Sequence, residues 1–190
     1  MPDTNKIKYG LKNVHYAVAT IAADGSATYS TPVAVPGAVN ISLAAQGDSS
    51  PFFADNIVYY TSVANNGYEG DLELARIPES MLTDILGNIV AQNKLVYEDA
   101  NAAPVHFALM FQFEGDATAR RHVMYNCTAT RPDVASATKA ESIEPQTETL
   151  TITSTSIYVS GIDKDVTKAY LNQGDTGYDT FFDAVLQPGQ

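Results

Sequence analysis

The chain has 190 residues, of which 22 are acidic and 11 are basic, so its formal net charge is −11. This negative net charge argues against a protein that binds the nucleic-acid backbone, because such binding needs a basic surface that displaces counterions. Hydrophobic residues make up 45% and charged residues 17%, which is typical of one folded domain and not of a disordered tail or a coiled coil.

The longest apolar runs are far shorter than the ~18 residues that a transmembrane helix requires. The N-terminal residues are polar and lack the apolar core of a signal peptide. The single cysteine, Cys127, excludes an internal disulfide. We therefore expect a soluble, acidic protein that is made in the cytoplasm and does not contact a membrane.

Alternating apolar and polar residues, interrupted by turn signals, predict short strands along most of the chain. Residues 46–55 have the composition of a loop, although they carry the adjacent Phe52 and Phe53, and residues 131–146 also predict a loop. The predicted strands are, in chain order, 13–22, 27–35, 38–45, 57–63, 68–77, a hairpin within 89–97, 105–113, 121–130 and 147–159.

One helix is predicted at about residues 78–86. Pro78 suits the first turn, where its missing N–H costs no hydrogen bond, and Gly87 suits the residue after the helix. Between them lies one apolar stripe formed by Met81, Leu82, Ile85 and Leu86. Many short strands with a single helix predict a mainly β protein, a β-sandwich or barrel with one flanking α-helix.

We expect one domain over residues 1–190, with an N-terminal arm at about 1–12 and a C-terminal segment at about 160–190. In the arm, three lysines set against Asp3 give a net charge of +2. This makes the arm a candidate contact with an acidic neighbour, through Lys6, Lys8 and Lys12.

Residues of the kinds that enzymes and metal sites use are scattered. His15, His106 and His122 have no metal-ligand spacing, and Cys127 alternates with apolar residues on a core-facing side of its strand. No phosphate-binding glycine loop or calcium loop is present in the sequence. The sequence therefore predicts no catalytic residue, no metal site and no cofactor, and an inert buried thiol at Cys127.

Three carboxylates form the most informative charged set. Glu69, Asp71 and Glu73 alternate along a predicted strand, so they share one face at intervals of about 7 Å. Three interpretations are open for this face: a solvated sheet surface, a divalent-ion site, or a surface that repels another polyanion.

Several sequence blocks carry a resemblance to a known family. They are KYGLKNVHYA at 8–17, PGAV at 36–39, QGD at 46–48, ADN at 54–56, NNGYEGDLE at 65–73, YNCTATRP at 125–132 and IEPQTETL at 143–150. Together they resemble the major tail proteins, or tail tube proteins, of long, non-contractile-tailed phages of Gram-positive bacteria. Residues 156–190 match more loosely.

The resemblance implies a tail-tube fold, similar to that of the tube protein of type VI secretion systems, that assembles into hexameric rings. The rings would stack into a hollow tube that conducts DNA into the host. It implies self-association, and a tape-measure protein and tail-tip and terminator proteins as partners. DNA would pass without specific binding. The protein would be made and assembled in the host bacterial cytoplasm and would reside in the virion tail, and the family has no catalytic residues.

Within this interpretation we expect Glu69, Asp71 and Glu73 to face the lumen, where like charge would keep DNA from adhering. Phe52 and Phe53 are candidates for an inter-subunit or inter-ring contact, although they could equally fold back over their own core. The threonine-rich strand 147–159 is a candidate sheet edge, with a plain solvent-facing strand as an equal alternative.

Two other classes of function remain open at this point. One is a solitary β-sandwich binding module that recognises a glycan or a cell surface, although the chain has no tryptophan and its 11 tyrosines are dispersed. The other is an acid–base enzyme that uses paired carboxylates, for which no companion residues are visible.

Overall fold

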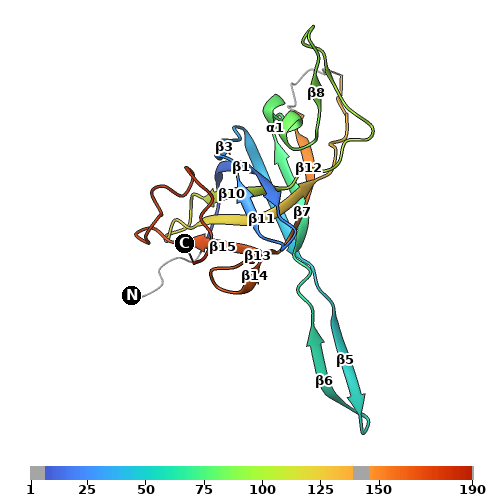
Figure 1. Cartoon of the computed structure of the whole chain (residues 1–190), viewed down its shortest axis with the longest axis vertical. Coiled ribbons are helices and arrows are strands. Elements are labelled where there is room, and N and C mark those ends of the chain that lie inside the picture. The colour runs from blue at the N-terminus through green and yellow to red at the C-terminus, as the bar shows by residue number, and fades with distance from the viewer. Residues whose placement is uncertain (1–6, 139–145, 190) are drawn as a thin grey trace.

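The structure of the chain, a computed structural model, describes residues 7–138 and 146–189. Figure 1 labels most of the elements in these two ranges. They are β1 (Leu11–Ile21), β2 (Ala27–Tyr29), β3 (Val33–Ala34), β4 (Ala38–Ala45), β5 (Ser49–Ala54), β6 (Ile57–Val63), β7 (Tyr68–Leu74), α1 (Glu79–Asp84), β8 (Ile89–Val90), β9 (Val96–Tyr97), β10 (Phe107–Phe113), β11 (Arg121–Ala129), β12 (Glu148–Thr155), β13 (Ile157–Val159), β14 (Lys164–Val166) and β15 (Lys168–Leu171).

The main sheet is antiparallel and has the strand order β2-β1-β10-β11-β12-β7-β4. One edge of β11 is shared by two partners. Arg121–Met124 pairs with β15, whereas Asn126–Ala129 pairs with β12. The sheet therefore forks where β15 and β12 meet, and the fork opens a cleft between β15 and the β7–β4 pair. The mainly β fold with one short helix is as predicted.

Two hydrophobic clusters lie on opposite faces of the central strand β10. Phe107, Leu109 and Phe111 belong to the first cluster, and Ala108 and Met110 belong to the second. The period-2 alternation predicted for this strand is confirmed, but both of its faces are buried. A strand that is covered on both sides carries apolar residues at nearly every position, and its one polar residue, Gln112, is buried with its side chain hydrogen-bonded.

The helix α1 covers the first cluster. Its Met81 and the following Ile85 are fully buried among residues of β1, β7, β10 and β12. Pro78 is the N-cap residue, in an extended conformation, and Gly87 follows the helix with a φ of +73°. The predicted helix is therefore confirmed, as a single short element whose stability comes from the packing of its apolar stripe.

The second cluster is closed by the C-terminal segment. Phe181 and Val185 are buried against β10, β11 and the short β13–β14 hairpin. Arg121 holds the segment from the sheet side, because its guanidinium donates to the carbonyl of Tyr178 and lies 3.9 Å from the centre of the Tyr178 ring. A cation over an aromatic face adds to this packing.

Two sequence-based predictions about strands are wrong. Residues 46–55 do not form a loop throughout, because Ser49–Ala54 is strand β5, paired with β6. The two residues between these strands, Asp55 and Asn56, have φ values of 52° and 62°, as a two-residue type I′ turn requires. Pro51 and the polar residues before it concealed the strand.

The threonine-rich strand is not a sheet edge. Its main part, β12, lies between β11 and β7, and β4 instead forms the end of the sheet order. The predicted strands 27–35 and 147–159 are each broken into two shorter strands, β2 with β3 and β12 with β13.

Candidate assembly surfaces

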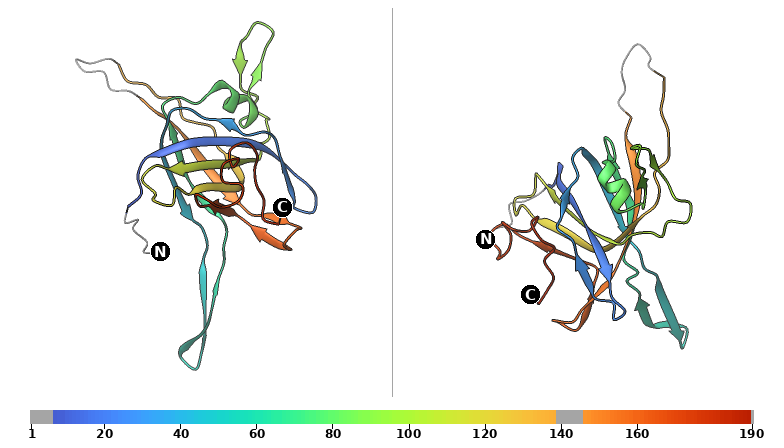
Figure 2. Two further views of the ribbon diagram at one scale, coloured as in Figure 1. Left: turned by 90° about the vertical axis from the view of Figure 1, so that its left-hand side faces the viewer. Right: turned by 45° about the horizontal axis from the view of Figure 1, so that its top comes forward.

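The β5–β6 hairpin is the most exposed apolar feature of the described residues. In Figure 1 and in both views of Figure 2 it extends away from the sheet as a long arm. Its large hydrophobic side chains are between 53% and 76% exposed: Phe52, Phe53, Ile57, Val58, Tyr59, Tyr60 and Val63. So many exposed apolar side chains on one projecting element mark an interaction site.

The two sides of the hairpin root, between β4 and β7, are joined to each other by backbone hydrogen bonds. The amide of Gln46 donates to the carbonyl of Gly67 at 2.9 Å, and the amide of Ala64 donates to the carbonyl of Asp48 at 3.0 Å. Gly67 has a φ of +92°, and a Cβ there would lie 2.0 Å from the carbonyl oxygen of Ser154. Glycine is therefore required where the arm leaves β7, close against β12.

Strand β7 carries the predicted acidic residues on its solvent-facing side. Glu69 and Asp71 are exposed and Glu73 is half-buried, while Leu72 and Leu74 point into the core. Their neighbours on β12 are threonines, and the hydroxyl of Thr151 donates to Asp71 Oδ1 at 2.9 Å.

The shared face predicted from the sequence is confirmed, and the three carboxylates run along it in a row. Among the residues that the structure describes, no group of three or more histidine, cysteine, aspartate or glutamate side chains has the geometry to hold a metal ion.

A basic cleft lies at the fork of the sheet. It encloses a cavity of about 210 Å³. The cavity is lined by Lys8, Ile41, Leu43, Tyr68, Phe111, Phe113, His122, Val123, Met124, Lys168 and Ala169, a set without any acidic residue.

Two exposed lysines are held over aromatic rings at this cleft. Lys8 Nζ lies 4.9 Å from the centre of the Phe113 ring, and Lys168 Nζ lies 4.4 Å from that of Tyr68. His122 stacks on Phe111, with ring centres 5.3 Å apart. Burial, aided by the positive charges of Arg120, Lys8 and Lys168 and opposed by Asp116, lowers the pKa of His122 to about 4. The cleft therefore offers aromatic surface together with positive charge.

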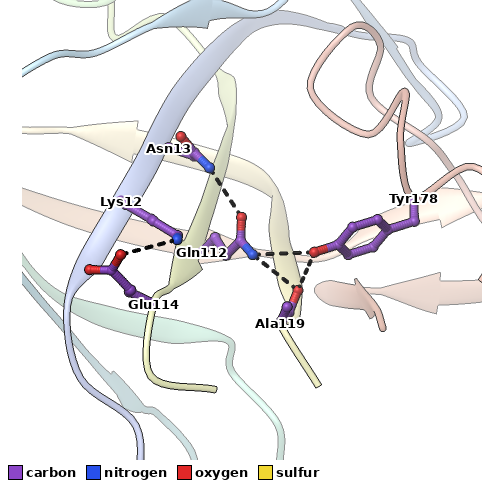
Figure 3. Close-up of polar contacts among 6 residues, drawn as sticks. All are labelled: Lys12, Asn13, Gln112, Glu114, Ala119 and Tyr178. Carbon is purple, nitrogen blue, oxygen red and sulfur yellow. Dashed lines mark hydrogen bonds and ion pairs between the residues drawn. The ribbon is translucent and has the colours of Figure 1, made fainter. Parts of the chain in front are cut away.

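The remaining lysines of the predicted N-terminal contact set differ in their surroundings. Lys12 Nζ forms an ion pair with Glu114 at 3.6 Å, so its charge is already partly compensated within the chain (Figure 3). Lys6 lies outside the described residues. Of the three predicted lysines, the structure places only Lys8 at the cleft.

A polar network fixes the strands beside this ion pair. Figure 3 shows Gln112 at its centre. The Gln112 side chain accepts from Asn13 Nδ2 at 3.1 Å and donates to the hydroxyl of Tyr178 and to the carbonyl of Ala119, both at 3.2 Å. This buried side chain therefore joins β1, the β10–β11 connection and the C-terminal segment.

A second, larger groove lies beside α1, with a cavity of about 680 Å³. Its apolar residues include Ile77, Leu82 and Leu86. Its charged residues are mostly acidic and comprise Asp71, Glu98, Asp133, Glu148 and one arginine, Arg131, which is ion-paired with Glu98. The two cavities therefore have opposite charge.

The candidate chemical residues do not form a common site. His15 stacks on Phe182, and His106 Nδ1 lies 2.7 Å from the side-chain oxygen of Asn126. Cys127 is fully buried, as predicted, and burial raises the pKa of its thiol to about 12. Each of these residues has a local structural role.

The sequence reasoning did not place Lys168 and His122 together with Lys8 in one cleft, because the cleft joins strands that are distant along the chain. It also treated the run at Ile57–Val63 only as a strand. The four consecutive apolar or aromatic residues 57–60, close to Phe52 and Phe53, were the available signal for an exposed contact arm.

The sequence matches a protein-family model, and the structure resembles a solved one. A family model described as "Phage tail tube protein" matches residues 2–187. A chain in the six-fold symmetrised cryo-EM structure of the anti-feeding prophage baseplate is similar at a TM-score of 0.46 and 10% identity, and the alignment covers 90% of this chain and 99% of that chain. No curated protein matches the sequence. No helix in the described ranges is long and apolar enough to cross a membrane.

Proposed function

This chain belongs to the phage tail tube protein family, whose members are structural proteins of the virion tail and not enzymes, and from this premise we propose that it assembles into stacked hexameric rings. The stacked rings form the hollow tube that conducts DNA into the host cell. The observation that carries the proposal is the β5–β6 hairpin, an exposed apolar arm on a chain of a tube-forming family.

Ring closure and ring stacking require contacts between unlike surfaces of identical subunits. The hairpin, including Phe52 and Phe53, supplies one such surface. Strand β4 has one paired side, toward β7, and is the end of the sheet order, so it supplies a second surface through which neighbouring sheets could join. A basic contact through Lys6, Lys8 and Lys12 stays a prediction from the sequence; of the two that the structure describes, Lys8 lies at the basic cleft and Lys12 is ion-paired with Glu114.

The acidic face of β7 is proposed to line the lumen through Glu69, Asp71 and Glu73. DNA carries one negative charge per ~1.7 Å of its axis, so a wall of the same sign would keep it from adhering during transit. The solvent-facing orientation of these carboxylates and the net charge of −11 both support this assignment.

The proposal extends to partners and location. The tube surrounds a tape-measure protein and ends on tail-tip and terminator proteins, and it is assembled in the cytoplasm of a Gram-positive host. DNA passes through it without specific binding.

Electron microscopy and sedimentation of the purified protein test the assembly. Rings or tubes are expected above a threshold concentration, and the double variant Phe52→Ser/Tyr60→Ser should remain monomeric with an unchanged melting temperature. A wild-type protein that stays monomeric, also when tail-tip proteins are supplied, would contradict the proposal. That result would favour the solitary binding module.

The lumen assignment has its own test. In tubes of the triple variant Glu69→Lys/Asp71→Lys/Glu73→Lys we expect DNA to be retained, with an affinity that falls steeply as salt rises. The matched control reverses Asp24, Asp163 and Asp165, which lie elsewhere on the surface. Equal retention by both variants would show that the acidic row does not line the channel.

A further inference from the structure

We propose that the basic cleft is the receptor for the β5–β6 hairpin of a second copy of this chain. In this contact Phe53 enters the cavity, and Asp55 at the hairpin turn lies between the ammonium groups of Lys8 and Lys168. The inference deepens the proposed function and rests on it, because it names the surface that the exposed hairpin meets.

The size of the cavity suits one aromatic side chain. A cavity of ~150 Å³ lined by apolar side chains holds a benzene ring, and the cleft cavity measures about 210 Å³. Its walls include Phe111 and Phe113, which favour an aromatic guest through edge or offset stacking. Phe53 is 61% exposed and is two residues from the turn, so it is near the tip of the arm.

Complementary charge favours the basic cleft as the binding site for the hairpin. The only charged residues between positions 46 and 67 are Asp48 and Asp55. The cleft carries Lys8 and Lys168 and no acidic residue. Complementary charge of this kind sets the register of a contact and accelerates encounter.

The larger groove beside α1 is the competing receptor, and its charge disfavours it. Four carboxylates line it against one arginine, and that arginine is already paired with Glu98. An arm that carries only aspartates would meet like charge there. The groove is therefore the alternative that the experiment must separate from the basic cleft.

The hairpin that fills the cleft must come from another molecule. Tyr68 lines the cavity and is also the first residue of β7, immediately after the arm. The arm leaves the sheet at this point and extends away from it in all three views (Figures 1 and 2). Each copy therefore presents one arm and one receptor on different surfaces, which is the arrangement that gives a ring or an open filament.

Complementation between two assembly-defective variants tests this contact. The first variant, Phe53→Ser/Asp55→Lys, has an intact cleft and an arm that cannot bind. The second, Lys8→Glu/Lys168→Glu, has an intact arm and a cleft that cannot bind it. Each alone should show at least a tenfold higher threshold concentration for assembly. An equimolar mixture should form a heterodimer that grows no further, because each pair has only one functional arm and one functional cleft.

The control variant Lys94→Glu/Lys164→Glu makes the same charge change outside the cleft and should assemble as wild type. If the wild type never assembles, the proposed function fails. If the wild type assembles and Lys8→Glu/Lys168→Glu assembles at the same threshold, only the present inference is overturned. Circular dichroism and melting temperature confirm that each variant is folded.

Disulfide trapping gives a second, independent result, because the native Cys127 is buried. Mixing Phe53→Cys with Leu43→Cys, which replaces a half-buried residue of the cleft lining, should give a cross-linked dimer. Mixing Phe53→Cys with Leu86→Cys, which places the second thiol in the acidic groove, should give no cross-linked dimer. Trapping only through Leu86→Cys would overturn the inference.

Discussion

The hydroxyl of Tyr16 donates a 2.8 Å hydrogen bond to Asp84 Oδ2 and so joins strand β1 to the last residue of α1. The Tyr16 side chain is fully buried, and burial raises its pKa to about 12, with Ser80 acting against the shift and Asp84 reinforcing it. This bond therefore fixes the short helix over the first hydrophobic cluster, which the six residues of α1 could not achieve through helix propensity.

Replacing Tyr16 with phenylalanine should lower the free energy of unfolding by about 1 kcal/mol, the usual net value of one such hydrogen bond. Asp84 is exposed, so water can satisfy its carboxylate in the variant. The control is Tyr158→Phe, which removes a 2.7 Å bond to Asp163 at the surface and should change stability little. Urea unfolding of both variants measures the difference, and equal losses would contradict the role assigned to Tyr16.

The C-terminal segment should be required for folding of the second cluster. Phe181→Ala removes a ring that is 2% exposed, and we expect a loss of about 3–5 kcal/mol in stability. Phe52→Ala makes the same chemical change on the arm and should leave the melting temperature of the monomer unchanged while weakening assembly. Thermal unfolding and sedimentation together separate the two effects. A stable Phe181→Ala variant would show that the segment packs only loosely.

The pH dependence of stability should report on His122. Its pKa falls from about 6.5 in the unfolded chain to about 4 in the folded protein, so between these values the unfolded state binds the extra proton. The stabilisation is complete above pH 6.5 and is lost as the pH falls through 6.5 toward 4.

His122→Phe keeps an aromatic ring in the cleft and removes this titration. Its stability should therefore decline less than that of the wild type between pH 6.5 and 4. Denaturant unfolding at several pH values measures this difference, and proton NMR of the imidazole gives the pKa directly. His15→Phe serves as the control outside the cleft, and parallel curves for His122→Phe and wild type would contradict the prediction.

The thiol of Cys127 should be inert in the folded protein. It is fully buried, and its pKa of about 12 leaves almost no thiolate at neutral pH. A thiol reagent should therefore label no site in the native chain and one site after denaturation. Rapid labelling of the native protein would mean that the second half of β11 opens readily, and it would also undermine the disulfide-trapping design.

Much of the fold was predictable because local patterns carry it. The alternation at 105–113 separates the two faces of β10, which pack against different hydrophobic clusters, and the apolar stripe of α1 reflects burial of one helix face. The acidic row of β7 was predictable for the same reason, since residues two apart on a strand share a face. Strand β5 was missed because Pro51 and two serines interrupt the pattern, and only pairing with β6 defines it.

The sequence by itself determined the mainly β class, the single helix, the shared face of Glu69, Asp71 and Glu73, and the tail tube resemblance. The sequence composition also determined the excess of acidic over basic residues. Each of these depends on composition or on residues close together in the chain, so periodicity and spacing are sufficient to identify it.

Only the tertiary structure decided which surfaces are free and which charges meet. It showed that the phenylalanine pair belongs to a projecting hairpin and that the threonine strand is internal. It also brought Lys8 and Lys168 to one aromatic cleft, although 160 positions separate them in the sequence. The physical reason is that the pairing of β11 with both β12 and β15 creates the fork, and such a long-range pairing leaves no periodic signal in any one segment.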